Sequence, residues 1–470
     1  MKHFMNRLMR AGVLACLLML LCAAARAAEY TVDPSGGGDY PSITEALAAA
    51  QDGDTLILCG GVYDENSESF PIIVDKRITL CAAQGQTPVI ASPRLVAAFE
   101  LNADGIRVSG LKIDFLRSGM WVQGNDVTVE KCVLTLADEA WRTSSCGMWI
   151  GGAKRLTMTD CAFVGCGAAL AGPPVSDASK GLPVLTGMFE VGEDIEFFTT
   201  HTIENCTVND KPLAYIVDLD NATYSEPCGQ LLAVGCDGTV FYGLDCSKAS
   251  MGIELAYCTD TVVEGCIADD AGIFGIYVAK SDDCILRACR ADRGAHGIDL
   301  RAIHRCIVER CESSGSGQGM FFSMAFDSLL TECRILENGT GFYAAAGDRN
   351  HMNDCLVEGN QLGIYIQKEP NFTVTGSTFR ANWNTGARST LAPGFALIGC
   401  TFEENWVAAM SNYSDGVFYY DNDFATSQIT SLYMKGNTQV RLLNNRFTEA
   451  DEALIDISEC PDILRWNQGS

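Results

Sequence analysis

The sequence predicts an all-β fold, built as one right-handed parallel β-helix. The first observation is a repeat of 22 or 23 residues, in which one position returns as Cys266, Cys289, Cys311, Cys333, Cys355, Ser377, Cys400, Asn422, Asn445 and Asn467. A second position runs in step with it as Gly252, Gly275, Gly297, Gly319, Gly341, Gly363 and Gly386. A fixed period in this range is typical of solenoids, whose repeats are stable only when stacked. Short apolar–polar alternation within each repeat indicates strands, and crossovers between parallel strands are right-handed.

This stacking also accounts for the cysteines, of which the chain has 22. Most recur once per repeat, so we expect them above one another inside the solenoid as small, mildly apolar side chains. Parallel Cβ vectors on successive rungs are a poor geometry for disulfides, so we expect mostly free, buried thiols. Where asparagine replaces cysteine in the column, we expect its amide to hydrogen-bond along the stack.

The chain divides into a leader and one repeat domain. Residues 1–27 combine basic residues, a short apolar run and a small-residue cleavage site, which predicts a secretory signal peptide and export to the periplasm, the cell surface or the medium. Residues 28–53 are expected to form an N-terminal strand and a capping helix, because a capping box begins at Ser42. Residues 54–470 would form the β-helix of roughly 15 rungs, with a loop excursion at about 171–200.

The charge excludes some partners. The net charge is −26 at pH 7. Binding to phosphate backbones or to anionic membranes needs clustered Lys and Arg, so a nucleic-acid partner is not expected. No segment after the leader has the length of a membrane span. The sequence leaves the oligomeric state open.

One outward-facing position predicts a binding surface. Aromatic faces flanked by carboxylates can stack on sugar rings and hydrogen-bond their hydroxyls. The alternative is that the aromatic side chains only stabilise neighbouring strands. The candidate carbohydrate-binding residues are Glu254, Tyr277, Asp299, Phe321, Tyr343, Tyr365 and Arg388.

A catalytic alternative rests on His296, Asp299 and Arg301, which lie within one repeat. A polysaccharide lyase or epimerase needs a base to take a sugar C–H proton and a positive charge to stabilise the carbanion that forms. His296 shares its column with Met251 and Phe274, so a histidine that points into the core is the competing interpretation.

Metal binding is a further hypothesis. Ca²⁺ prefers hard oxygen ligands, and copper accepts soft Cys or Met ligands. Paired acidic residues in turns are also commonly just solvated, so both interpretations stay open. The candidate Ca²⁺ ligands are Asp218, Asp220, Asp282 and Asp283.

Two segments resemble known families. Thr31 to Tyr63 resembles the opening of exported right-handed β-helix proteins, which include pectinesterase-like and NosD-like families. His201 to Tyr215 resembles the NTVNGKPVYY signature of NosD-like proteins, with Asp210 in place of the usual glycine. The resemblance implies a pectin-lyase-like solenoid of the carbohydrate-binding and sugar-hydrolase type. The Gln, Asp, Asp and Arg motifs of the pectinesterases are not found in this chain, so esterase activity is not expected.

The leading expectation for function is therefore an exported protein that binds carbohydrate or polysaccharide along one face of the solenoid. The NosD resemblance implies a first alternative, a periplasmic accessory protein in copper-centre maturation. A polysaccharide lyase or epimerase is the second alternative. Binding without catalysis is favoured over an enzyme, because the sequence contains no clear catalytic constellation.

Overall fold

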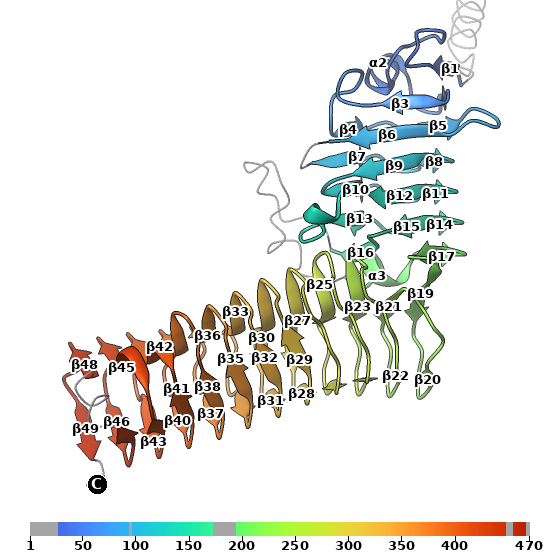
Figure 1. Ribbon diagram of the computed structural model, residues 1–470. Coiled ribbons are helices and arrows are strands. Elements are labelled where there is room, and N and C mark those ends of the chain that lie inside the picture. The colour runs from blue at the N-terminus through green and yellow to red at the C-terminus, as the bar shows by residue number, and fades with distance from the viewer. Residues whose placement is uncertain (1–26, 94–95, 173–193, 448–454, 467–470) are drawn as a thin grey trace, which may run out of the picture.

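The computed structural model describes residues 27–93, 96–172, 194–447 and 455–466. The chain forms a parallel β-solenoid of about 18 turns, somewhat more than the roughly 15 rungs expected. Figure 1 shows two arms, one coloured blue to green and the other green to red, that meet at a bend near β16. The predicted fold class is confirmed, whereas the regular repeat does not predict the bend.

Three parallel sheets form the faces of the N-terminal arm. Sheet A contains β1 (Glu29–Val32), β2 (Thr55–Leu58), β5 (Thr79–Ala82), β8 (Arg107–Ser109), β11 (Thr128–Glu130), β14 (Thr157–Thr159) and β17 (Thr202–Glu204). Sheet B contains β3 (Gly61–Tyr63), β6 (Pro88–Ser92), β9 (Lys112–Phe115), β12 (Val133–Leu136), β15 (Ala162–Val164) and β18 (Thr207–Val208). Sheet C contains β4 (Ile72–Val74), β7 (Ala97–Leu101), β10 (Ser118–Val122), β13 (Cys146–Gly151) and β16 (Ala168–Ala171).

Three further sheets form the C-terminal arm. Sheet D contains β19 (Lys211–Val217), β21 (Gln230–Val234), β23 (Met251–Ala256), β25 (Phe274–Ala279), β27 (His296–His304), β30 (Gln318–Phe326), β33 (Thr340–Ala345), β36 (Leu362–Gln367), β39 (Thr385–Thr390), β42 (Asn405–Asn412), β45 (Ser427–Lys435) and β48 (Ile455–Ser458). Sheet E contains β20 (Thr223–Tyr224), β22 (Val240–Tyr242), β24 (Val262–Glu264), β26 (Ile285–Arg287), β28 (Ile307–Glu309), β31 (Leu329–Thr331), β34 (His351–Asn353), β37 (Thr373–Thr375), β40 (Ala396–Ile398), β43 (Phe418–Tyr420), β46 (Val440–Leu443) and β49 (Ile463–Trp466). Sheet F contains β29 (Glu312–Ser314), β32 (Arg334–Leu336), β35 (Leu356–Glu358), β38 (Thr378–Arg380), β41 (Thr401–Glu403), β44 (Asp423–Phe424) and β47 (Arg446–Phe447).

The predicted columns lie in register. Leu286, Val308 and Leu330 pair across β26, β28 and β31, which places Cys289, Cys311 and Cys333 in one file. Every cysteine in the described residues is free, and most are buried. Farther along the file, the Asn422 side-chain amide donates to Asn445 Oδ1 at 2.8 Å, as expected for a ladder of buried amides.

The glycine column has a steric cause. A Cβ on Gly319 would lie 2.5 Å from the carbonyl oxygen of Gly341 on the next rung, closer than van der Waals contact allows. The chain therefore needs glycine near the N-terminal end of each of these sheet D strands, where the backbones of neighbouring rungs approach each other closely.

A hairpin reverses the chain at the bend. β18 and β19 pair antiparallel, and the two residues between them, Asn209 and Asp210, have φ angles of 50° and 63°. Positive φ at both central residues is the requirement of a type I′ turn, in which glycine is common at the second position. The segment that resembles the NosD signature thus forms the turn that ends sheet B and begins sheet D.

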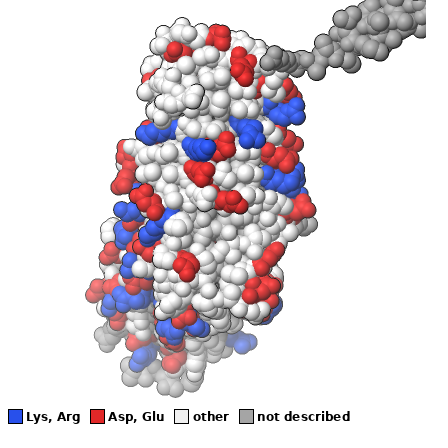
Figure 2. Space-filling view, turned by 90° about the vertical axis from the view of Figure 1, so that its right-hand side faces the viewer, with Lys and Arg blue, Asp and Glu red and all other residues white. Residues whose placement is uncertain are grey.

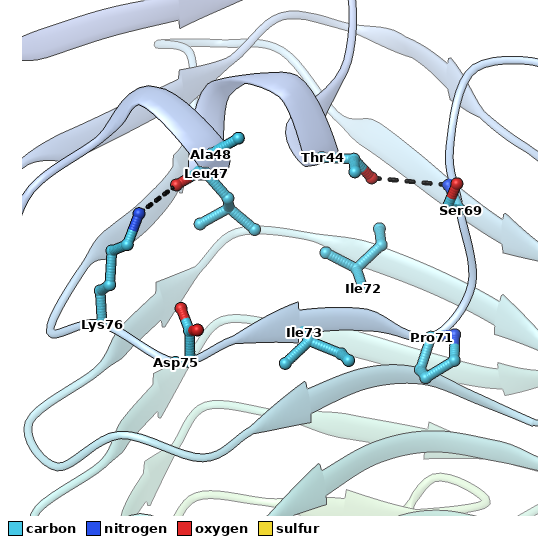
Figure 3. Close-up of a pocket in the computed structure, with 9 residues that line it drawn as sticks. All are labelled: Thr44, Leu47, Ala48, Ser69, Pro71, Ile72, Ile73, Asp75 and Lys76. Atoms are coloured by element: carbon cyan, nitrogen blue, oxygen red, sulfur yellow. Dashed lines mark hydrogen bonds between the residues drawn. The ribbon is translucent and has the colours of Figure 1, made fainter. Parts of the chain in front are cut away.

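The helix α2 (Ile43–Ala49) covers the first rungs. Its N-cap Ser42 accepts a hydrogen bond from the backbone of Glu45, as the capping box predicts. Buried Glu68 accepts the first two helical amides, and the Lys76 amine donates to carbonyl oxygens at the other end. Figure 3 shows a shallow hollow between α2 and β4, bordered by Lys76. Each end of α2 therefore faces a charge that complements the helix dipole.

Two predicted segments lie outside the described residues. These are the signal peptide, of which only the last residue is described, and most of the loop excursion, since residues 173–193 separate β16 from the short helix α3 (Glu196–Thr199). A one-turn 3-10 helix, η1 (Glu139–Trp141), precedes β13.

Charges of both signs alternate on the outer surface. Figure 2 shows acidic and basic side chains interspersed on one face of the solenoid. On the outer face of sheet E, Arg287 lies between Glu264 and Glu309 on the neighbouring rungs and pairs with both. Exposed pairs of this kind contribute little to stability, but they show that this ladder carries no basic patch.

Candidate functional site on the outer face of sheet D

The seven predicted carbohydrate-binding residues form one file. Glu254 pairs with Tyr277, Tyr277 with Asp299, and Asp299 with Phe321 on successive rungs of sheet D. Tyr343, Tyr365 and Arg388 continue the file across β33, β36 and β39. The alternate residues, such as Ile253 and Leu255, point into the core, so the file lies on the outer face.

Burial divides this file into two parts. Glu254, Tyr277 and Asp299 are fully buried, whereas the four residues from Phe321 to Arg388 are half-buried. The difference arises because Trp149 and neighbouring residues of β13 and β16 pack at the bend against side chains of β23 and β25. The accessible part of the predicted surface therefore begins at Phe321.

Side chains of sheet D cap the edge strand of sheet C at this bend. The Gln230 amide bonds both the nitrogen and the oxygen of Ala168, and Glu254 Oε2 accepts from the backbone of Leu170 at 3.1 Å. Unpaired edges need such cover in stable sheets. Glu254 Oε1 has no hydrogen-bond partner in the described residues, and burial raises the pKa of this carboxyl to about 8. Glu254 is thus a structural cap that stays protonated at neutral pH.

The predicted catalytic trio is close together in space. Arg301 contacts the two oxygens of Asp299 through Nε and a terminal nitrogen, at 2.7 and 2.9 Å, and His296 Nδ1 lies 3.0 Å from Asp299 Oδ2. The His296 side chain is 24% exposed on the outer face, so the interpretation of an inward-facing histidine is wrong. Burial opposes ionisation of Asp299, but the Arg301 charge and the hydrogen bonds outweigh it and lower the pKa of the carboxyl.

This arrangement is mainly an ion pair. The Arg301 guanidinium also lies over the rings of Phe274 and Phe321, at 5.3 and 5.0 Å from their centroids. It is 8% exposed. A carbanion-stabilising cation must face the substrate, and this one faces Asp299 and two aromatic rings. The geometry therefore assigns Arg301 and Asp299 to the packing of the bend.

Ring faces in the accessible part of the file are covered by stacking. Phe321 and Tyr343 lie 5.1 Å apart, and Tyr343 and Tyr365 lie 5.3 Å apart with an interplanar angle of 9°. The Arg388 guanidinium covers the far side of this stack, 4.8 Å from the Tyr365 centroid. These rings therefore present edges and hydroxyl groups to solvent, which favours the alternative that they stabilise adjacent strands.

Polar groups next to this stack have unused hydrogen-bonding capacity. Within the described ranges, Arg388 has no carboxylate partner, and its Nε has no hydrogen-bond acceptor. Thr390 Oγ1 and Asn412 Oδ1, which pair across β39 and β42, are also without partners in that part of the chain. Unsatisfied polar groups cost free energy, so their clustering on one face suggests that a ligand or water binds there.

The predicted metal ligands are dispersed. Asp283 pairs with Arg305 at 2.6 and 2.7 Å, and Asp282 lies 3.0 Å from His304 Nδ1. Asp218 and Asp220 belong to the turn after β19. In the described ranges no three His, Cys, Asp or Glu side chains converge as metal ligands.

Two exposed tryptophans were not among the predicted site residues. Trp383 is 73% exposed and Trp406 is 48% exposed, and they occupy equivalent positions on successive rungs. Trp383 lies just before β39 and Trp406 lies at the start of β42. A 23-residue spacing, with asparagine before each tryptophan, is the sequence signal that could have identified them.

Comparison with known proteins identifies the class. The family described as "Right handed beta helix region" matches residues 97–301 and 251–393, and the chain belongs to this family. Within it the chain is NosD-like, because residues 346–470 match the family described as "Periplasmic copper-binding protein (NosD)". No curated protein matches the chain.

Several solved structures resemble the chain at low sequence identity. The periplasmic alginate epimerase AlgG is 12% identical over 78% of this chain and 84% of its own, with a TM-score of 0.36. The mannuronan C-5 epimerase AlgE4 A-module of Azotobacter vinelandii is 10% identical over 91% and 94%, with a TM-score of 0.33. Pectate lyase Pel9A is 14% identical over 87% and 80%, with a TM-score of 0.25.

None of the helices in the described ranges has the length and hydropathy of a membrane span.

Proposed function

We propose that the chain is an exported protein that binds a polysaccharide along the outer face of sheet D, between β33 and β42. The observation that carries this proposal is the half-buried Arg388 guanidinium, which lacks an acidic partner in the described residues although the chain has a net charge of −26. Export is part of the proposal, in keeping with the NosD family match and with the leader expected at residues 1–27.

The chemistry next to Arg388 suits a sugar. Tyr343, whose hydroxyl bonds Gln367 at 2.5 Å, and Tyr365 contribute phenol groups, and Thr390 and Asn412 contribute a hydroxyl and an amide. Such groups pair with hydroxyls, and a guanidinium forms two parallel hydrogen bonds with a carboxylate. We infer that Arg388 contacts an acidic sugar of the polysaccharide.

Affinity electrophoresis tests this function. The protein should migrate more slowly in gels that contain polygalacturonate than in gels without polymer, and Arg388→Ala should weaken this retention about tenfold or more, since hydrogen bonds to charged groups are worth about 1.5–3 kcal/mol. Arg334→Ala is the matched control, because Arg334 is exposed on sheet F and paired with Glu312. Unretarded migration of the wild-type protein in gels with acidic and neutral polysaccharides alike would refute the proposal.

A further inference from the structure

Trp383 and Trp406 expose their aromatic faces, unlike the tyrosines of sheet D. Neither indole stacks on an aromatic ring elsewhere in the described chain, and the exposed fractions of 73% and 48% are high for this residue. A single exposed tryptophan is common on protein surfaces, but two exposed tryptophans on adjacent rungs form an apolar patch. Ile429, 48% exposed, extends this patch to a third rung.

Buried asparagines hold both tryptophans in place. Asn382 and Asn405 directly precede them, and the backbone of Asn382 donates to Asn405 Oδ1 at 3.1 Å. The Asn382 side-chain amide donates to Asn405 Oδ1 at 2.8 Å and to the carbonyl of Val357 at 3.0 Å. The ladder continues through Asn360 in the same way, with a hydrogen bond of 3.1 Å to Asn382. Because every buried amide in it is bonded, the ladder fixes the backbone that carries the indoles.

A β-bulge adjoins Trp406. Asn405 pairs with Ser427, but Val407 pairs with Thr430, so β45 has one extra residue opposite Trp406. Bulges of this kind redirect side chains and are frequent beside functional sites. Here the bulge leaves Gln428 and Ile429 exposed next to the indole.

The surroundings of the indoles are polar. Gln361, Asn384 and Gln428 are exposed on the same column or next to it and offer amide donors and acceptors. Glu403 and Glu404 precede Trp406, so phosphate is disfavoured there. The C–H edges of a sugar ring carry partial positive charge and attract the negative face of an indole, while amides bond the hydroxyls.

We propose that Trp383 and Trp406 form a platform on which the pyranose rings of a polysaccharide chain stack. The ligand class rests on the proposed function, whereas the position of the platform rests on the exposed indoles and on the ladder beneath them. Arg388, in β39, follows Trp383 by five residues, a reach of about 17 Å, so one polysaccharide chain can span both. The platform supplies the ring-face contact that the stacked tyrosines cannot supply.

Equilibrium titration with polygalacturonate and with mannan, followed by tryptophan fluorescence and affinity electrophoresis, tests the platform. Trp383→Ala and Trp406→Ala should each weaken binding of the retained polymer about tenfold, and the double variant should abolish the wild-type emission shift. Trp141→Ala is the matched control, because Trp141 is 43% exposed and lies near the bend. It should bind as the wild type does, and circular dichroism should be the same for all variants.

The other outcomes separate the two proposals. If Arg388→Ala loses binding while the double tryptophan variant keeps wild-type affinity, the platform is refuted and the proposed function stands. If the tryptophan variants change the oligomeric state in analytical ultracentrifugation and leave polymer binding intact, the patch is an interface between copies of the chain, which also overturns the platform. If the wild-type protein binds neither polymer, the proposed function fails and the ligand named here fails with it.

Discussion

Asp299→Asn should lower the free energy of unfolding by about 3–5 kcal/mol, the usual cost of breaking a buried ion pair. The substitution removes the negative charge that neutralises Arg301, whose side chain is 8% exposed between two aromatic rings. The loss should appear as a lower urea midpoint and as faster hydrogen exchange in β25 and β27.

The control for this prediction is Asp283→Asn. Asp283 makes the same two-point contact with Arg305, but at the surface, where such pairs are worth about 1 kcal/mol or less. The pKa of Asp299 lies below its value in unfolded chains, so the pair stabilises the protein above about pH 4, and this contribution is lost as the pH falls through the folded-state pKa. Equal midpoint shifts in the two variants would contradict the assignment of Asp299 to a buried pair.

Glu254→Gln should make the protein more stable at alkaline pH. An unfolded glutamate titrates near pH 4.3, whereas the folded pKa of Glu254 is about 8. The folded state therefore holds the proton more tightly. As the pH rises between these two values, the free energy of unfolding of the wild-type protein falls by about 1.4 kcal/mol per pH unit. From pH 5 to pH 8 the total decrease in the free energy of unfolding is on the order of 4 kcal/mol. Glutamine can still accept the hydrogen bond from the Leu170 backbone amide but does not ionise, so Glu254→Gln should abolish this decrease.

Urea denaturation between pH 5 and 9 measures this effect. The midpoints of the wild type and of Glu254→Gln should nearly coincide at pH 5 and separate progressively toward pH 8. Glu264→Gln, on the outer face of sheet E, should follow the wild type, because Glu264 is partly exposed and takes part only in a surface pair. A difference in urea midpoint between wild type and Glu254→Gln that stays constant at all pH values would mean that Glu254 is not a buried carboxyl with a raised pKa.

The repeat made the regular part of the fold predictable. Cys289 and Cys311 are 22 residues apart in the sequence and stack on adjacent rungs, so a periodic column translates directly into a spatial file. The predicted file from Glu254 to Arg388 follows from the same logic. The repeat did not predict which part of this file is exposed to solvent. Glu254 is buried because it contacts Leu170 at the bend, and 84 residues separate the two in the sequence.

The bend has only a weak local signal. The turn at Asn209 and Asp210 reverses one hairpin, but the contacts between sheets C and D depend on side chains from distant repeats. The same limit applies to the aromatic file. The sequence indicates that Tyr343 and Tyr365 are neighbours, and only the side-chain conformations show that their faces are covered. The 23-residue spacing of Trp383 and Trp406 is visible in the sequence, but a repeated apolar residue can point either into the core or outward. Only the exposure of the two side chains in the structure shows that they point outward.

Hydroxyl-radical footprinting with and without the retained polysaccharide tests most directly whether the ligand lies along this face. We expect the polysaccharide to lower the oxidation of Trp383, Trp406 and Tyr365. Oxidation of Tyr242, which is 54% exposed on sheet E, should not change. Protection confined to other parts of the solenoid, with the two tryptophans oxidised equally in both samples, would contradict it.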